Sequence, residues 1–262
     1  MKLLILFFSA AVLALSCSSP TPPEIKGAYK LLSTTYKSET SSSTGGVPHL
    51  KIYTDEYMMY SYFDEEDSAA SFGVGTYTLN QDSMVETEFY FSLDAYFSDE
   101  EESFATLIEK TDKGYKQIDN DVPAAGGATF DITHEYESVG TGKTSPLDGA
   151  WIMTNAFIVN EKGDTTQMTD IRQYKVYYSG NFMFGHTTVD SLEVMHTGMG
   201  YGTFDMSGDN SARETVQSSI YPEAIGSFDL AVTFNGADEF TQTIKGEGGN
   251  VSSTETYKRL GK

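Results

Sequence analysis

The chain contains the same sequence twice, and this repeat limits the architectures that it can form. Four blocks recur in the same order at nearly constant spacing: GAY at 27 and GAW at 149, KIYTDEYMMY at 51 and KVYYSGNFMF at 175, GVGTYTLNQD at 73 and GYGTFDMSGD at 200, and THEYESV at 133 and TETYKRL at 254. Such internal similarity indicates that one structural unit occurs twice. The turn-rich linker GTGKTSP at 140–146 separates the copies, so we predict two domains, 27–139 and 147–262.

Within each copy the residues favour β-strands. Segments rich in Tyr, Phe, Val, Ile, Thr and Met are separated by turn-forming residues, of which Asn235-Gly236 is the pair most typical of a two-residue hairpin. No long segment has the 3.6-residue period of an amphipathic helix. A copy of about 110 residues can form roughly eight strands of typical length. We therefore predict an all-β chain of two tandem small antiparallel barrels; a two-sheet sandwich fits the same pattern nearly as well.

The N-terminal segment predicts export. Lys2 precedes an apolar run from Leu3 to Leu15, and the only cysteine, Cys17, follows closely. This order is typical of a secretory signal peptide, and the apolar run is too short to span a bilayer. Residues 14–17, ALSC, resemble a bacterial lipobox, which predicts removal of residues 1–16 and lipid attachment to Cys17. Residues 17–26 then form a tether, and we expect a cell-envelope lipoprotein, anchored by its lipid in the outer membrane and facing the periplasm or the exterior.

The charge of the chain excludes one class of partner. The 38 acidic residues outnumber the 17 basic ones, which gives a net charge of −21. A surface of this sign repels phosphate backbones, so we expect no nucleic acid as a partner. With a single cysteine the chain forms no internal disulfide, and its stability must come from a hydrophobic core.

The sequence presents no catalytic motif. It has no G-x-S-x-G and no paired Cys-x-x-Cys, and no two of its many acids are singled out as a catalytic pair. His186 and His196 flank a turn and could face each other as metal ligands, but solvent-facing strand residues are the commoner case. The acidic runs at 64–67 and 99–102 lack the ligand spacing of a calcium loop and are better read as solvated loops. We therefore expect a protein that is not an enzyme and has no catalytic residue, metal site or cofactor.

Glycines recur inside the strand patterns, as in GVG at 73–75 and GMGYG at 198–202. No helix follows either stretch, so they are not phosphate-binding loops. Glycine inside a strand marks a bulge, a sharp bend or a close approach of two backbones. We interpret these glycines as the bends of a small, tightly curved barrel.

Several segments together resemble a known family. GAYKLL at 27, KIYTDEYMMYSY at 51, GVGTYTLNQD at 73, VETEF at 85, PEAIGSFDLAVTF at 222, EFTQTI at 239 and TYKRL at 256 resemble the lipocalin-like domains of envelope lipoproteins and secreted proteins from Bacteroides-type bacteria. The resemblance covers both copies. It implies eight-stranded calycin-type barrels without enzymatic activity. It also implies that Arg259 lies across Trp151, two residues after Gly149, and closes one end of the second barrel; Tyr29 and Ser138 replace this pair in the first copy.

The many aromatic and methionine side chains leave two functions open. In the first, each barrel holds a small apolar or amphipathic ligand in a cavity; we expect the lining to include Tyr57, Met59 and Tyr77 in the first copy and Phe182, Phe184 and Phe204 in the second. In the second, the barrels are solid, and the protein is a structural or interaction module that binds an envelope protein through its acidic surface. An outer-membrane β-barrel is a third, weaker alternative.

Overall fold

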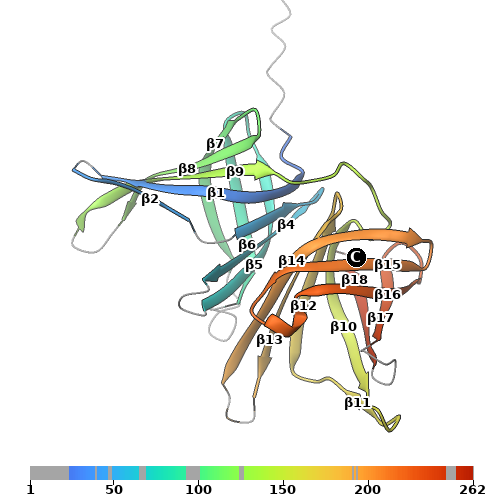
Figure 1. Cartoon of the computed structure of the whole chain (residues 1–262). Helices are drawn as coiled ribbons and strands as arrows, with labels where there is room; N and C mark the ends of the chain where they lie inside the picture. The colour runs from blue at the N-terminus through green and yellow to red at the C-terminus, as the bar shows by residue number, and fades with distance from the viewer. Residues whose placement is uncertain are drawn as a thin grey trace, which may run out of the picture.

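The protein forms two β-barrels side by side (Figure 1). In the computed structural model the described residues are 24–38, 40–46, 49–64, 69–92, 101–123, 127–190, 192, 194–245 and 252–261. The predicted signal peptide, Cys17 and most of the tether lie outside these residues, as do residues 65–67 and 99–100 of the two acidic runs. None of the helices among the described residues is long and apolar enough to cross a membrane.

The first copy is one antiparallel sheet that closes on itself. Its strands are β1 (Gly27–Lys37), β2 (Ser42–Gly45), β3 (His49–Tyr53), β4 (Tyr57–Asp64), β5 (Ala69–Leu79), β6 (Ser83–Phe91), β7 (Glu102–Lys110), β8 (Gly114–Pro123) and β9 (Thr129–Ser138). The sheet order is β2-β1-β3-β4-β5-β6-β7-β8-β9, and β1 also pairs with β9. The strands β1 and β3 to β9 therefore form a closed eight-stranded barrel, here the first barrel, with β2 added outside it.

The second copy repeats this arrangement. Its strands are β10 (Gly149–Val159), β11 (Thr165–Gln167), β12 (Ile171–Tyr178), β13 (Asn181–Val189), β14 (Met195–Gly208), β15 (Ser211–Ser219), β16 (Gly226–Phe234), β17 (Glu239–Lys245) and β18 (Ser252–Arg259), with a short 3-10 helix at Pro222–Ala224. Pairing of β10 with β18 closes the second barrel, and β11 lies outside it as β2 does. The prediction of two tandem antiparallel barrels is confirmed, and the sandwich alternative is wrong.

Each barrel has its own apolar interior. In the first barrel it includes Tyr29, Tyr53, Met58, Met84, Ile108, Tyr115 and Tyr136. In the second it includes Trp151, Tyr177, Phe182, Phe204, Leu230, Phe240 and Tyr257. Both interiors are rich in aromatic rings, which accounts for much of the aromatic excess in the sequence.

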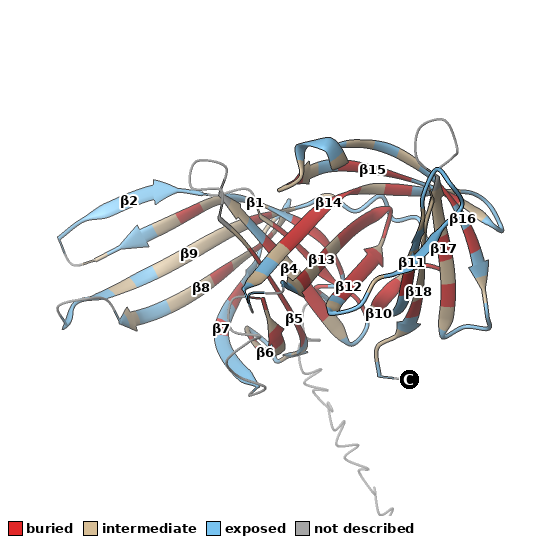
Figure 2. Ribbon diagram, turned by 90° about the horizontal axis from the view of Figure 1, so that it is seen from below, coloured by how far each residue is buried: buried red, intermediate tan, exposed pale blue. Residues whose placement is uncertain are grey.

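A third apolar cluster joins the outer faces of the two barrels. It contains Ala28, Leu50, Ile52, Met59, Phe72, Val74 and Tyr90 from the first copy and Ala150, Tyr174, Val176, Met183, Met199 and Tyr201 from the second. Figure 2 shows these buried stretches of β4, β5, β12, β13 and β14 gathered between the barrels. The contact is close, because a Cβ atom on Gly185 of β13 would lie 2.5 Å from the ring of Phe72 in β5.

Two of the interior glycines, Gly75 and Gly202, occur where the sheets bend. Both sheets have a bulge at the same place, between Val74 and Gly75 in the first copy and between Tyr201 and Gly202 in the second. A Cβ on Gly75 would lie 2.3 Å from a backbone carbonyl oxygen of β6, and a Cβ on Gly202 would lie 1.9 Å from one of β15. No other residue fits such a close approach of two backbones, so the interpretation of these glycines as barrel bends is confirmed.

Candidate functional site

The first barrel has a cavity of about 600 Å³. It is lined by side chains of β3, β4 and β6 to β9, namely His49, Lys51, Tyr60, Glu86, Glu88, Ser103, Phe104, Ala105, Gln117, Asp119, Asn120, Asp121, Val122, Pro123, Ile132, His134 and Tyr136. This volume lies within the range typical of small-molecule sites. The lining combines aromatic rings with several polar groups that point inward.

A buried ion pair lies in the wall of this cavity. The Nζ atom of Lys51 is 2.9 Å from both carboxylate oxygens of Glu86, and each side chain is 5% exposed. Lys51 also donates to Gln117 Oε1 (3.3 Å), and the Tyr53 hydroxyl donates to Glu86 at 2.6 Å. Burial works to lower the pKa of Lys51, but the charges of Glu86, Tyr136 and Glu88 and the hydrogen bond to Glu86 together outweigh it, and the pKa is raised. Because such a pair neutralises itself, it gives the cavity fixed dipoles rather than net charge.

Two histidines and a second glutamate line the same space. Burial, helped by the positive charge of Lys51, lowers the pKa of His49 well below its usual value and also lowers that of His134. Burial raises the pKa of Glu88 to about 7, although a hydrogen bond from Tyr60 works against this. At neutral pH the two histidines are therefore uncharged, and Glu88 is close to half protonated.

The mouth of the cavity is irregular. A bulge in β8 between Asp119 and Val122 interrupts its pairing with β9, and Asp121 has a φ of 54°. Bulges and left-handed non-glycine residues are found preferentially next to binding sites. Phe104 lies at the same mouth with 47% of its surface exposed, so an apolar ring is available to a ligand as it enters.

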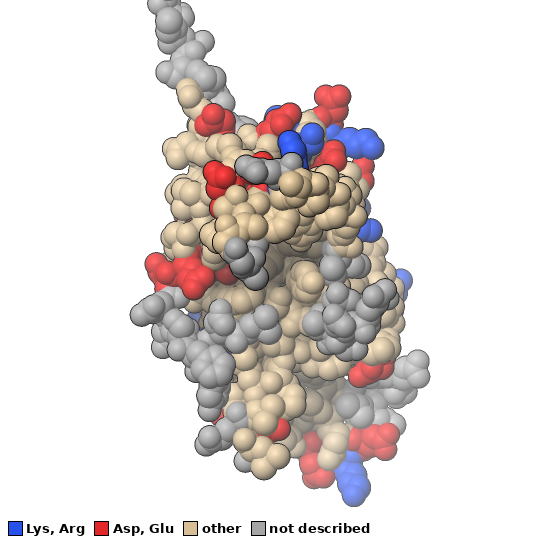
Figure 3. All heavy atoms as spheres, turned by 90° about the vertical axis from the view of Figure 1, so that its left-hand side faces the viewer, with Lys and Arg blue, Asp and Glu red and all other residues tan. Residues whose placement is uncertain are grey.

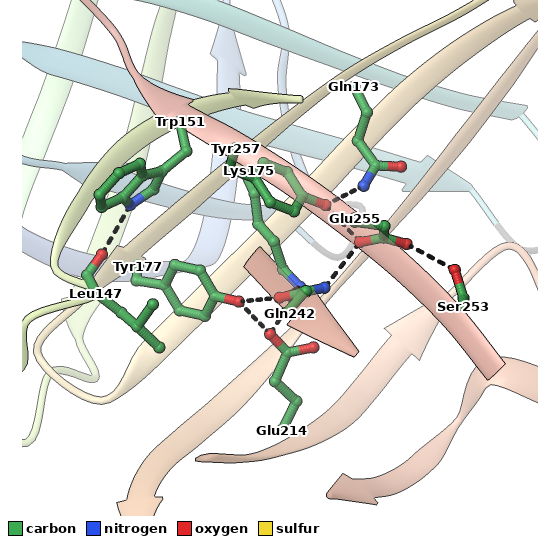
Figure 4. A network of polar contacts seen from close by, with 10 residues as sticks. All are labelled: Leu147, Trp151, Gln173, Lys175, Tyr177, Glu214, Gln242, Ser253, Glu255 and Tyr257. Carbon is green, nitrogen blue, oxygen red and sulfur yellow. Dashed lines mark hydrogen bonds and ion pairs between the residues drawn. The ribbon is translucent and has the colours of Figure 1, made fainter. Parts of the chain in front are cut away.

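The set of buried polar side chains around Lys51 in the first barrel has an equivalent in the second barrel, which Figure 4 shows. Lys175 pairs with Glu214 at 2.7 Å and donates to Gln242 Oε1 at 3.3 Å, and the Tyr177 hydroxyl also donates to Glu214. The registers of the two sheets align Lys51 with Lys175, Glu86 with Glu214, Gln117 with Gln242 and Tyr53 with Tyr177. These residues were not predicted from the sequence to form a site. Their recurrence in both repeats could have indicated one.

Two of the residues predicted to line a cavity in the second barrel are packed against its other rings. The ring centroid of Tyr177 lies 4.8 Å from that of Phe204 and 5.9 Å from that of Phe182. Phe182 is fully buried, and Phe204 is 6% exposed. Phe184 is half-buried and packs against the same interior, next to His186, with their rings stacked at 6.4 Å. The Nζ atom of Lys175 lies 5.3 Å from the ring centroid of Tyr177 and 5.4 Å from that of Phe182, so these rings pack around the Lys175–Glu214 pair.

The predicted lining of the first barrel is wrong. Met59 points out of the barrel into the apolar cluster between the two copies, and Tyr57 packs against that cluster beside a groove of about 210 Å³. Tyr77 lies inside, but it packs on Tyr53 and donates its hydroxyl proton to the Thr54 carbonyl, away from the cavity. The error arose because both faces of β3 to β5 are buried, so apolar residues did not distinguish inside from outside.

Arg259 lies over the ring of Trp151, with the guanidinium carbon 4.1 Å from the ring centroid. The two residues are cross-strand neighbours of β10 and β18. Trp151 is fully buried and donates to the Leu147 carbonyl at 2.8 Å, and Arg259 donates to the Asp148 carbonyl at 2.9 Å. In the first barrel Tyr29 lies opposite Ser138, so that barrel has no such stack.

The two histidines considered as metal ligands bind other partners. His196 is exposed and lies 3.0 Å from Asp190, while His186 is stacked between Phe184 and Tyr221. Within the described part of the chain no group of three or more His, Cys, Asp or Glu side chains is arranged to hold a metal ion.

Charged side chains are spread over the surface near the first barrel. Figure 3 shows this side of the molecule, with acidic groups scattered across it and Lys and Arg mainly near its upper edge. The surface therefore shows no single large patch of one sign on this face.

Known proteins offer little for comparison. No family model matches the chain, and no curated protein matches it. One similar solved structure is a protein of unknown function from the DUF3598 family of Nostoc punctiforme, which is 10% identical, with 90% of this chain and 96% of that chain covered and a TM-score of 0.28. A likeness this distant carries no information on what this chain binds.

Proposed function

We propose that this protein binds a small amphipathic ligand in the cavity of the first barrel and has no enzymatic activity. The observation that carries the proposal is the cavity of about 600 Å³, with aromatic rings at its walls and mouth and the Lys51–Glu86 pair and Gln117 among its polar groups. An apolar body can pack on the rings while a polar end exchanges hydrogen bonds with the polar groups.

The second barrel serves a supporting role in this proposal. Its interior is filled by Phe182, Phe204, Tyr177 and Phe240, which favours a solid structural unit for this half of the chain. The alternative function is an interaction module with solid barrels that binds an envelope protein. Only the packed interior of the second barrel supports it.

Binding can be tested with Nile red, an uncharged dye whose fluorescence rises in apolar surroundings. We expect saturable binding to the purified protein. We expect Ile132→Trp, which places a bulky indole ring in the cavity, to weaken dye binding at least tenfold. Ile225→Trp, at an exposed position of the second copy, is the matched control and should bind as the parent does. A dye site that is absent, or that Ile132→Trp leaves unchanged, refutes the proposal.

We further propose that the chain is a tandem lipocalin-like lipoprotein of the outer membrane, facing the periplasm or the exterior. The ALSC segment at 14–17 and the Trp151–Arg259 stack support this reading. The expected result of Cys17→Ala is loss of the protein from the membrane fraction, because lipid attachment supplies the anchor. Fractionation with immunodetection measures this, and an unchanged membrane fraction would show that another element anchors the chain.

A further inference from the structure

The two equivalent glutamines differ in one hydrogen bond. In the second barrel Gln242 Nε2 donates to the Glu255 carboxylate at 2.7 Å. In the first barrel Gln117 accepts from Lys51 in the same way, but its Nε2 group has no acceptor among the described residues, and Gln117 lines the cavity. A donor without an acceptor next to a cavity is a group that a ligand can satisfy.

The neighbouring strands explain the difference. Gln242 lies opposite Glu255, which lies opposite Ala156; Gln117 lies opposite His134, which lies opposite Thr34. Thr34 forms a 3.0 Å hydrogen bond with Nδ1 of His134, which ties that ring to β1. Ala156 has no such group, so Glu255 turns to Gln242. The first barrel thus lacks the inner carboxylate of the second.

A second hydrogen-bond donor to Glu255 in the second barrel also has an equivalent in the first. In the second barrel the Tyr257 hydroxyl also donates to Glu255, at 2.7 Å. Its equivalent, Tyr136, lines the cavity of the first barrel. The Nε2 atom of His49, in the same lining, is buried and has no hydrogen-bond partner among the described residues. Gln117 and Tyr136 therefore take the places of the two residues that donate to Glu255 in the second barrel, while His134 takes the place of Glu255 itself.

We propose that a carboxylate group of the ligand occupies in the first barrel the place that the Glu255 carboxylate takes in the second, accepting hydrogen bonds from Gln117 Nε2 and the Tyr136 hydroxyl. This inference rests on the proposed function and names its ligand class, amphiphiles with a carboxylate head. The second barrel holds both Glu214 and Glu255 beside the single Lys175. The first barrel has Glu86 beside Lys51 and Glu88 in the same lining, so the ligand carboxylate requires Glu88 to be protonated, as its raised pKa of about 7 allows. The apolar body of the ligand then extends past Tyr60 toward Phe104.

Titration calorimetry with decanoate, decanol and decylamine tests the head group. We expect decanoate to bind at least tenfold more tightly than decanol. Gln117→Leu and Tyr136→Phe should each weaken decanoate by about tenfold or more, the usual effect of one lost hydrogen bond to a charged group, and leave decanol unchanged. Gln167→Leu, at an exposed position of β11, is the matched control.

A second variant introduces into the first barrel the internal carboxylate of the second. Thr34→Ala combined with His134→Glu supplies the internal carboxylate, so we expect a folded protein that has lost decanoate binding. Equal affinity for decanoate and decanol overturns the inference but leaves the proposed function standing. If decylamine binds more tightly than decanoate, and Glu88→Gln removes that binding, the ligand is cationic. That result also overturns the inference and leaves the proposed function standing. Failure of every ligand, Nile red included, overturns both proposals.

Discussion

The charge of Glu88 changes near neutral pH. Burial raises its pKa from 4.5 to about 7, so ionising it costs more in the folded protein than in the unfolded chain. Its contribution to stability is complete below about pH 4.5 and is lost as the pH rises through about 7. We expect Glu88→Gln to equal the parent near pH 4 and to exceed it in free energy of unfolding at pH 8. Urea unfolding at the two pH values measures this.

The exposed Glu109→Gln is the control for charge removal alone. It should give the same difference from the parent at both pH values. If Glu88→Gln and the parent lose stability equally between pH 4 and pH 8, the carboxyl of Glu88 is ordinary, and other groups such as Asp148, whose pKa burial raises to about 6, account for the dependence.

The residues of the candidate site were harder to predict than the strands that hold them. Lys51 and Glu86 sit in alternating segments, and alternation alone assigns such residues to a wet face. Here the alternation is reversed: Leu50 and Ile52 point out of the first barrel into the apolar cluster between the two barrels, while Lys51 points inward. A single copy of the sequence carries no sign of this reversal. The return of the same lysine, glutamate and glutamine in the second copy does.

At the level of the strands, the paired glycines were predictable because their chemistry leaves few alternatives. A glycine in a strand has neither a side chain to pack nor a strong β-propensity, so its presence implies a backbone requirement. The number of strands followed from length and turn signals. What length and turns could not give was which face of each strand points inward, because that depends on the contact between the two copies.

The bulge of β14 gives a test at this scale. Gly202→Ala would place a methyl group 1.9 Å from the Thr215 carbonyl oxygen, and backbone cannot move away as a side chain can. We expect a loss of about 2 kcal/mol or more in the free energy of unfolding, as for other overpacked sites. Gly208→Ala in the same strand would place its methyl group 3.5 Å from Ser211 Oγ, an ordinary contact distance, and should change stability little. Equal effects of the two substitutions in urea unfolding would contradict the account of the bulge.

For the whole molecule, the cluster between the barrels decides whether each copy is independent. The repeat predicts that residues 147–262 fold alone. In the full chain, however, Met183 and Met199 of the second copy are fully buried against the first, with Val176 only 1% exposed. Separation would expose these side chains as a contiguous apolar patch. We expect the isolated segment to self-associate and to unfold at lower urea concentration than the same barrel in the full chain.

Size-exclusion chromatography and urea unfolding of the isolated segment measure these two effects. A monomer with the unfolding midpoint of the full chain would show that the contact contributes nothing to the stability of the second barrel.

The position of Trp151 makes the second barrel a built-in optical reporter for the first. As the only tryptophan, it dominates the intrinsic fluorescence, yet it lies in the barrel without the described cavity. A ligand that binds only the folded state stabilises it by RT ln(1 + [L]/Kd). The midpoint of every unfolding transition coupled to the ligand site rises as a result. If the shared cluster makes the two barrels unfold together, a ligand held in the first will delay the loss of the Trp151 signal in the second. Thermal unfolding followed at the tryptophan wavelength, with and without decanoate, would then measure communication between the two halves; an unmoved midpoint despite binding would mean that the halves melt separately.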